Sequence, residues 1–113
     1  MNKEKKIAPT HPGKILKNRF LVPLGVSQSQ LARDINVSLR KVNEICLEKR
    51  PITLDTAARL AIYWPVSAEF WLGMQQQYDW EVFQDQSESK LRSVIRPFKA
   101  EESDIKGVFA NFN

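Results

Sequence analysis

The sequence predicts an all-α fold of five packed helices, followed by a C-terminal tail of short helices or strands. Apolar residues recur at three- and four-residue spacing along most of the chain, which is the pattern of amphipathic helices. Ser or Thr precedes four of the patterned segments, and Asn or Pro follows two of them, as expected at helix ends. With 113 residues and 42% hydrophobic content, the chain can form one modest core without metals or disulfides.

The first expected helix begins at Pro12 and presents Ile15, Leu16 and Phe20 on one face. His11 precedes it and is the only histidine in the chain. Because no Cys, Asp or Glu stands at ligand spacing from His11, this residue is neither half of a metal site nor, by itself, a catalytic base. We therefore expect no metal and no cofactor, and we place His11 near the N-terminus of this helix.

Residues 28–47 predict two short helices joined by a tight turn. Ser27 and Gln30 fit a capping box at the start of the first helix, and Ser38 is the N-cap of the second. Asn36 stands between them, where the reversal of the chain favours a left-handed backbone. The apolar residues of the pair are Leu31, Ala32, Ile35, Val37, Val42, Ile45 and Cys46. Two helices packed in this way can place the second one in a DNA groove.

Surface chemistry favours DNA recognition over the alternative that these two helices form only a packing unit. Ser27 and Gln28 stand at a helix N-terminus, where phosphate oxygens are favoured. On the second helix, Leu39 suits a thymine methyl, Arg40 suits a guanine edge, and Glu44 can accept from cytosine. The full set of candidate DNA-binding residues is Ser27, Gln28, Ser38, Leu39, Arg40, Lys41, Asn43, Glu44, Lys49 and Arg50.

Two further helices complete the predicted domain. Thr53 caps the fourth, which ends before Pro65, and Ser67 caps the fifth. The apolar face of the fourth helix consists of Ala57, Leu60, Ala61 and Trp64. The fifth carries a stripe of Phe70, Trp71, Met74, Tyr78 and Val82. We expect that stripe to close the core against the first helix, because aromatic stripes at helical spacing are more often packing than ligand pockets.

The tail repeats one apolar pattern twice, fourteen residues apart. The two sets are Leu91, Val94, Ile95 and Phe98, then Ile105, Val108, Phe109 and Phe112. Pro97 and Gly107 interrupt the segments, so two short amphipathic helices are favoured over one long helix, with β-structure left open. A domain closed by five helices has little room for these side chains, and we expect them to contact a second copy or another partner.

We expect the chain to divide into a flexible N-terminal arm (1–10), a helix-turn-helix DNA-binding domain (11–85) and a dimerisation or partner-binding tail (86–113). The net charge of +4 is unevenly distributed. Residues 1–65 carry 12 basic and 5 acidic residues, whereas residues 66–113 carry 5 and 8. The basic part suits phosphates, and the acidic part suits a basic partner.

The composition also bears on where the protein acts. Cys46 is the single cysteine and cannot form an internal disulfide, and its place on an apolar face favours a buried, inert thiol over a redox switch. The chain has no run of eighteen apolar residues, and its first ten residues lack the apolar stretch of a signal peptide. We therefore expect a cytoplasmic protein with no membrane partner.

The two-helix segment resembles the helix-turn-helix of the XRE (Cro/phage-repressor) family, and a longer match is similar to the HigA-type antitoxins. The match covers residues 11–83 and includes HPGKILKNRFLVPLGVSQSQLA, KRPITLDTAARLA and SAEFWLGMQQQYD. These segments follow that family's Pro-Gly-opened first helix, Lys-Arg-x-Ile-Thr link and Phe-Trp-Leu helix. The chain has Asn36 and Pro51 where the family often has Gly. It also has Leu47 and Glu48 where the family has Asn-Gly.

The resemblance implies a lambda-repressor-like domain and a HigA-type role. Proteins of that type neutralise a small ribosome-dependent mRNA-cleaving toxin and repress the operon that they share with it. A small basic toxin protein is therefore an implied partner, although no motif identifies the residues that would bind it. As a DNA-binding repressor, the chain would act as a homodimer on a palindromic operator of double-stranded DNA. Its half-sites would lie about 34 Å apart or a multiple of that.

Other classes of function fit parts of the same pattern. A stand-alone XRE-family transcriptional regulator would have no toxin, and a helical protein-interaction adaptor would use the domain for protein contacts alone. A small basic ribonuclease would need a general acid and a general base at one phosphate, and His11 is the only candidate that titrates near neutral pH. We therefore expect a protein that is not an enzyme and has no catalytic residues. A salt-dependent shift of duplex DNA would exclude the adaptor.

Overall fold

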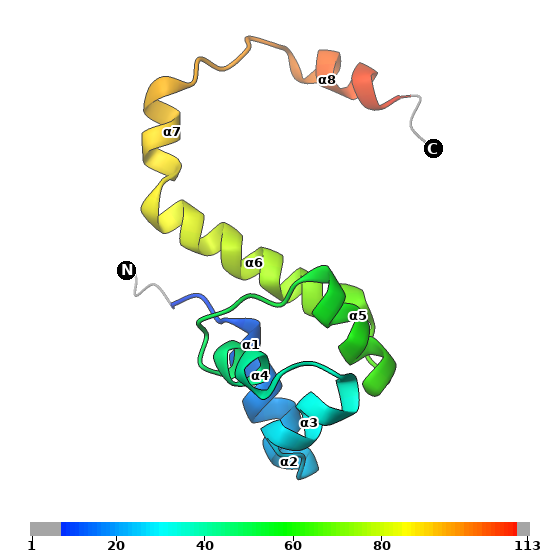
Figure 1. Cartoon of the computed structure of the whole chain (residues 1–113). Coiled ribbons are helices and arrows are strands. Elements are labelled where there is room, and N and C mark those ends of the chain that lie inside the picture. The colour runs from blue at the N-terminus through cyan, green and yellow to red at the C-terminus, as the bar shows by residue number, and fades with distance from the viewer. Residues whose placement is uncertain (1–7, 111–113) are drawn as a thin grey trace.

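The computed structural model describes residues 8–110, and within that range the regular structure is all helical. The elements are α1 (Pro12–Ile15), η1 (Leu16–Leu21), α2 (Val22–Leu24), α3 (Gln28–Ile35), α4 (Leu39–Cys46), α5 (Leu54–Tyr63), α6 (Ala68–Gln86), α7 (Glu88–Val94) and α8 (Glu102–Phe109). Figure 1 shows α1 to α5 and the start of α6 gathered in one globule, from which α6, α7 and α8 lead away. The predicted all-α fold is confirmed.

The first predicted helix forms as one helical segment, residues 12–24, with a π-helical turn, η1, at its centre. There the Val22 N–H donates to the Lys17 carbonyl, five residues back. Pro23 accounts for this wider register, because its ring has no N–H to donate and needs room beside the carbonyl four residues earlier. The segment ends at Gly25, whose φ of 68° is left-handed.

Helices α3 and α4 form the predicted pair, and local hydrogen bonds fix where each begins. The Oγ of Ser27 accepts from the Gln30 N–H at 3.0 Å, and the Oγ of Ser38 caps α4 in the same way. Asn36 has a φ of 59°, which confirms the predicted left-handed turn. The Gln30 side chain does not return to the Ser27 N–H, so only half of the predicted capping box forms.

Helix α4 also ends at a left-handed residue that is not glycine. Glu48 has a φ of 65°. Its N–H donates to the Ile45 carbonyl at 2.9 Å, and the Lys49 N–H donates to the Glu44 carbonyl at 2.8 Å. These are the two bonds of a Schellman motif, in which glycine is the usual left-handed residue. Asn36 and Glu48 therefore both adopt the left-handed conformation for which glycine is the usual residue.

One core joins η1, α3, α4, α5 and the start of α6. Among the described residues, the buried apolar side chains are Leu16, Leu21, Leu31, Ala32, Ile35, Val42, Ile45, Cys46, Ile52, Ala57, Leu60 and Trp71. The Phe20 ring lies between helices, 5.0 Å from Trp64, 4.8 Å from Trp71 and 6.2 Å from Phe70, measured between ring centroids. The predicted closure of the core by the fifth helix against the first is confirmed.

The stripe on α6 differs from the prediction in one respect. Phe70 is 40% exposed, whereas Gln75, a polar residue outside the stripe, is buried. The Oε1 atom of Gln75 accepts from the Ile52 N–H at 2.8 Å, and its Nε2 atom donates to Asp79 at 2.9 Å. This amide satisfies a backbone donor in the link before α5, which explains why it is buried. The apolar pattern of α6 cannot predict this burial, because the Ile52 N–H belongs to a different segment.

The tail forms two short helices, as the favoured prediction has it, and no strand occurs in its described part, residues 87–110. Gly107 was expected to interrupt the second helix, but it lies inside α8 in an ordinary helical conformation. The described residues of both repeated apolar sets are exposed. Phe112, the last residue of the second set, lies outside the described residues. The radius of gyration is 19.0 Å, against about 13 Å for a compact domain of this length.

The predicted division into three parts remains a prediction. Of the expected arm, 1–10, the structure describes only residues 8–10, which precede α1 without regular structure. The boundary at residue 85 falls one residue before the end of α6. Within residues 8–110, none of the helices is both long and apolar enough to cross a membrane.

Candidate nucleic-acid interface

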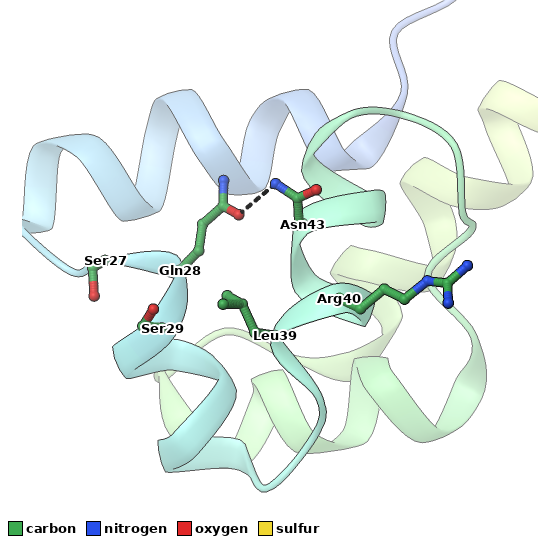
Figure 2. Close-up of a pocket in the computed structure, with 6 residues that line it drawn as sticks. All are labelled: Ser27, Gln28, Ser29, Leu39, Arg40 and Asn43. Carbon is green, nitrogen blue, oxygen red and sulfur yellow. Dashed lines mark hydrogen bonds between the residues drawn. The ribbon is translucent and has the colours of Figure 1, made fainter.

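An open hollow of about 540 Å³ lies between the N-terminal ends of α3 and α4. Its lining consists of Ser27, Gln28, Ser29, Leu39, Arg40 and Asn43. Three of these residues belong to α3 or its cap and three to α4. Figure 2 shows Gln28, Leu39 and Asn43 close together between the two helices, whereas the Arg40 side chain extends away from them. Five of these six residues are candidate DNA-binding residues from the sequence, and Ser29 is not. The backbone N–H groups at two helix N-termini therefore adjoin one concave surface, which is where anions are favoured.

Helix α4 presents different chemistry on its two sides. Val42, Ile45 and Cys46 are buried, whereas Leu39 is 49% exposed and the Arg40 side chain is 81% exposed. Burial raises the pKa of the Cys46 thiol to about 11, so that thiol stays protonated near neutral pH. This supports the interpretation of Cys46 as a core residue. The exposed side of α4 is the side that a duplex would meet.

A hydrogen bond joins the two helices at the hollow. The Nδ2 atom of Asn43 donates to the Oε1 atom of Gln28 at 3.2 Å, as the dashed line in Figure 2 marks. The bond holds each amide in one orientation and leaves the Gln28 Nε2 and the Asn43 Oδ1 as a donor and an acceptor on the surface. The bond thus links Gln28, which we expect to contact phosphate, with Asn43, which we expect to contact bases or phosphate.

Glu44 accepts hydrogen bonds from two arginines. Its Oε2 accepts from the Arg40 Nε at 2.9 Å, and its Oε1 accepts from the Arg50 Nε and Nη2 at 3.0 and 2.7 Å. The Arg40 bond and then the Arg50 bond lower the pKa of the Glu44 carboxyl, and the bond to Glu44 raises the pKa of Arg40. A contact from Glu44 to cytosine, as predicted, would have to compete with these bonds. In this structure the carboxylate orients Arg40 and Arg50.

Close backbone contact positions the C-terminal end of α4. Gly13 in α1 lies so near Ile45 that a Cβ on Gly13 would overlap the Ile45 carbonyl oxygen. His11 caps α1, with its Nδ1 accepting from the Gly13 N–H at 2.9 Å. Burial lowers the pKa of the His11 imidazole, so the neutral form that can accept this bond is favoured. His11 is therefore a structural N-cap, at the place the sequence predicted.

The turn between α3 and α4 is held by a residue that sequence reasoning missed. The Nη1 atom of Arg59 donates to the carbonyls of Ile35 and Asn36, at 2.8 and 3.2 Å, and its Nε donates to Asp55 at 2.8 Å. The Asp55 to Arg59 spacing of four residues is visible in the sequence and predicts an ion pair. Its second role depends on residues 23 and 24 positions earlier. No local pattern records that contact.

The remaining predicted residues lie outside the hollow. Ser38 caps α4, and Lys41 is half-buried in the first turn of that helix. Lys49 is exposed beyond the other end of α4, next to Arg50. The bonds of Glu44 to Arg40 and Arg50 connect the hollow with the residues after α4. Within residues 8–110, no group of three or more His, Cys, Asp or Glu side chains is placed to hold a metal ion.

Known proteins resemble this chain in sequence and in structure, although no family model matches it. Virulence-associated protein I of Dichelobacter nodosus is 38% identical over 96 residues, which are 85% of this chain and 87% of that protein. The Pseudomonas aeruginosa antitoxin HigA, solved with the higBA promoter, has a TM-score of 0.78 and 36% identity over 80% of this chain and 99% of its own. The antitoxin GraA, solved with its operator, has a TM-score of 0.79 and 30% identity over 88% and 100%.

These likenesses extend over nearly the whole length of the proteins compared. They include the α3–α4 pair, because a match to at least 80% of 113 residues cannot leave out a central segment. The resemblance found in the sequence motifs and the resemblance found in the helical arrangement agree. The chain belongs to the HigA-type antitoxins of the XRE (Cro/phage-repressor) helix-turn-helix family.

Proposed function

We propose that this protein binds its own operator as a sequence-specific repressor and neutralises a small mRNA-cleaving toxin encoded beside it. The observation that carries the DNA-binding half is the hollow at the joined N-termini of α3 and α4, with Leu39, Arg40 and Asn43 facing outward. A concave surface with two helix N-termini and an exposed arginine fits the phosphates and base edges of a duplex.

In the proposed complex, α4 lies in the major groove. The N-terminus of α3, with Ser27 and Gln28, binds a backbone phosphate and sets the register. Arg40, held through its Nε by Glu44, directs its two Nη groups to the O6 and N7 atoms of a guanine. Leu39 contacts a thymine methyl. The further base or backbone contacts come from Lys41, Asn43, Lys49 and Arg50.

The proposed operator is palindromic, because the proposed repressor is a homodimer. Two copies related by a two-fold axis place two α4 helices about 34 Å apart, or a multiple of that, on one face of the duplex. The solved structures of HigA with the higBA promoter and of GraA with its operator support the binding of an operator. Such a complex forms where chromosomal DNA and mRNA lie, in the cytoplasm.

The toxin half of the proposal rests on the family. The relatives with solved structures are called antitoxins, which implies a toxin partner. The strongest alternative is a stand-alone regulator, because one relative is a Haemophilus influenzae protein described only as an HTH-type transcriptional regulator, 31% identical over 90 residues. Purification of the chain together with the product of the adjacent reading frame distinguishes the two. An antitoxin forms a stable complex and stops mRNA cleavage in a translation extract, whereas a stand-alone regulator does neither.

Replacement of Arg40 by Ala tests the DNA-binding half. We expect Arg40→Ala to weaken operator binding by about 1–3 kcal/mol, or roughly 5- to 150-fold, and to relax specificity at one base pair of each half-site. The measurement is fluorescence anisotropy with duplex DNA from the protein's own promoter and with variants of each base pair. Arg19→Ala is the matched control, because it also removes one exposed arginine but lies on η1, outside the hollow and outside the tail.

A second variant separates base reading from phosphate binding. Lys49→Ala should weaken binding to all sequences alike and reduce the salt dependence of affinity by about one ion. Wild-type affinity and specificity in Arg40→Ala would contradict the proposed docking of α4. Equal losses in Arg40→Ala and Arg19→Ala would show that only net charge matters.

A further inference from the structure

Three charged side chains are bonded in series along α4 and the link that follows it. Arg40 and Glu44 lie on α4, and Arg50 lies in the link. The two arginines bind different oxygens of the Glu44 carboxylate, with Arg40 on Oε2 and Arg50 on Oε1. The three side chains together carry two positive charges and one negative charge. We call them the α4 ion cluster.

Arg40 is held at one end of its guanidinium group. Its Nε donates to Glu44 at 2.9 Å, and both Nη groups lie outside that bond. The side chain is 81% exposed, and it extends away from Gln28, Leu39 and Asn43 in Figure 2, so these three residues do not fix it. Without Glu44, an arginine this exposed would adopt many rotamers. The bond restricts Arg40 to conformations in which its two Nη groups remain available as a fork for guanine O6 and N7.

Arg50 holds the same carboxylate from the other side. Its Nε and Nη2 donate to the Oε1 of Glu44 at 3.0 and 2.7 Å. The bonds from Arg40 and then from Arg50 lower the pKa of the Glu44 carboxyl, which keeps it ionised near neutral pH. An ionised carboxylate repels phosphates unless cations compensate its charge. To accept from cytosine, Glu44 would have to give up part of the bonding that compensates it.

We propose that Glu44 is a positioning residue for Arg40 and does not itself read a base, and that Arg50 acts on base specificity through Glu44. The inference rests on the proposed binding of operator DNA. Arg50 fixes Oε1, and this keeps Oε2 in place for the Arg40 Nε. Recognition of a guanine by Arg40 therefore depends on a residue beyond the end of α4 that need not contact that base pair.

Replacement of Glu44 by Ala should change two affinities in opposite directions. Affinity for an unrelated duplex should rise at least about twofold in about 50 mM salt, because a negative charge leaves the binding surface. Discrimination at the base pair read by Arg40 should fall at least about fivefold, because the guanidinium is no longer oriented. The measurement is fluorescence anisotropy with the operator, with a variant of each of its base pairs, and with an unrelated duplex. Damage to the fold would lower both affinities together.

Arg50→Ala and Lys49→Ala form a matched pair of variants. Each removes one positive charge, and the two residues are neighbours, but the bonds to Glu44 come from Arg50. We expect Arg50→Ala to lower discrimination at the Arg40 base pair at least about threefold, whereas Lys49→Ala weakens binding to all sequences alike. A uniform loss in both variants would overturn the link from Arg50 to Arg40.

Nuclear magnetic resonance of the free full-length protein tests the cluster without DNA. The side-chain carboxyl carbon of Glu44 should titrate below its usual pKa range in the wild type, and Arg40→Ala and Arg50→Ala should each raise that pKa. Lys49→Ala should raise it less than either. A Glu44 pKa that Arg50→Ala leaves unchanged would show that Arg50 does not hold the carboxylate, and would overturn the proposal.

The outcomes separate this inference from the proposed function. If Glu44→Ala keeps discrimination at the Arg40 base pair and loses a preference for cytosine at another, Glu44 reads a base and the inference is wrong. If Arg40→Ala relaxes specificity as expected and Glu44→Ala changes nothing, DNA binding stands and the positioning role is rejected. A wild-type protein that binds no duplex from its own promoter would reject the function, and with it the role of Glu44 in specificity.

Discussion

The globule and the tail carry the same kind of sequence pattern, yet they differ in what covers it. Both place apolar side chains at helical spacing, and both form the helices that this spacing predicts. In the globule Trp71 is 0% exposed, whereas in the tail Phe109 is 59% exposed. The difference teaches that an amphipathic pattern specifies a helix and its apolar face, but not the surface against which that face packs.

The two regions also differ in the reach of their polar contacts. In the globule, Arg59 and Gln75 bind backbone groups 23 or more residues away. In the tail, the Arg92 to Glu88 ion pair spans one helical turn, with the arginine 78% exposed. Exposed pairs of that kind contribute about 0.5 kcal/mol or less. The globule is held by contacts between distant segments, and the tail by local ones.

The largest expected contrast is between aromatic truncations in the two regions. Trp71→Ala should lower the free energy of unfolding by about 3–5 kcal/mol, because it leaves a cavity in the core. Phe109→Ala should lower it by less than about 0.5 kcal/mol in the monomer, where that ring is already exposed. Urea denaturation measures both losses when the protein concentration is low enough to keep the chain monomeric. Similar losses for the two variants would mean that the tail packs on the globule.

A second contrast concerns glycines. Gly13→Ala should cost about 1–3 kcal/mol, because the new methyl group would overlap the Ile45 carbonyl oxygen and force α1 away from α4. Gly73→Ala on α6 should stabilise the protein by about 0.5–1 kcal/mol, since its Cβ meets nothing within 4 Å. Thermal denaturation compares the two, and operator binding by Gly13→Ala reports whether α4 has moved. Equal changes in stability for Gly13→Ala and Gly73→Ala would show that α1 and α4 are not in close contact at Gly13.

The third prediction concerns pH and the cap of α1. Burial lowers the pKa of folded His11 below 6.5, although the charges of Glu48 and Asp79 oppose the shift. The unfolded chain therefore binds a proton first as pH falls. Stability is highest above pH about 6.5 and declines below it, until folded His11 is also protonated, with a slope of at most about 1.4 kcal/mol per pH unit.

His11→Asn is the variant that isolates this effect, because Asn can cap a helix and does not titrate. Urea denaturation between pH 7.5 and pH 5 should show a smaller decline for His11→Asn than for the wild type. Parallel declines in the two proteins would assign the pH dependence to other groups.

The smallest expected effect is at the end of α4. Glu48→Gly should stabilise the protein by about 0.5–1 kcal/mol, because Gly adopts the φ of 65° without the strain that a side chain brings. Glu81→Gly inside α6 should instead destabilise it by about 1 kcal/mol. Differential scanning calorimetry resolves both shifts. A loss of stability in Glu48→Gly would show that the Glu48 side chain makes a contribution larger than the backbone strain.

The sequence predicted well the features that depend on near neighbours. The caps at Ser27, Ser38, Thr53 and Ser67 and the turn at Asn36 form as expected, because each rests on groups within a few residues. Five of the six residues around the hollow are among the candidate DNA-binding residues named from the sequence, since they lie on one helix face and at one helix start. Among these features, the prediction erred at Gln30, whose side chain does not complete the capping box with Ser27.

By itself, the sequence determined the five helices of the domain, the caps at which four of them start, and that α4 turns an arginine-bearing face to solvent. Only the tertiary structure decided that Gly13 contacts the end of α4, that Arg59 holds the turn, and that Glu44 binds two arginines at once. The physical reason is range. A helix and its cap are stabilised by atoms a few residues apart, whereas these three contacts depend on how separate segments meet, and that depends on the packing of the whole core.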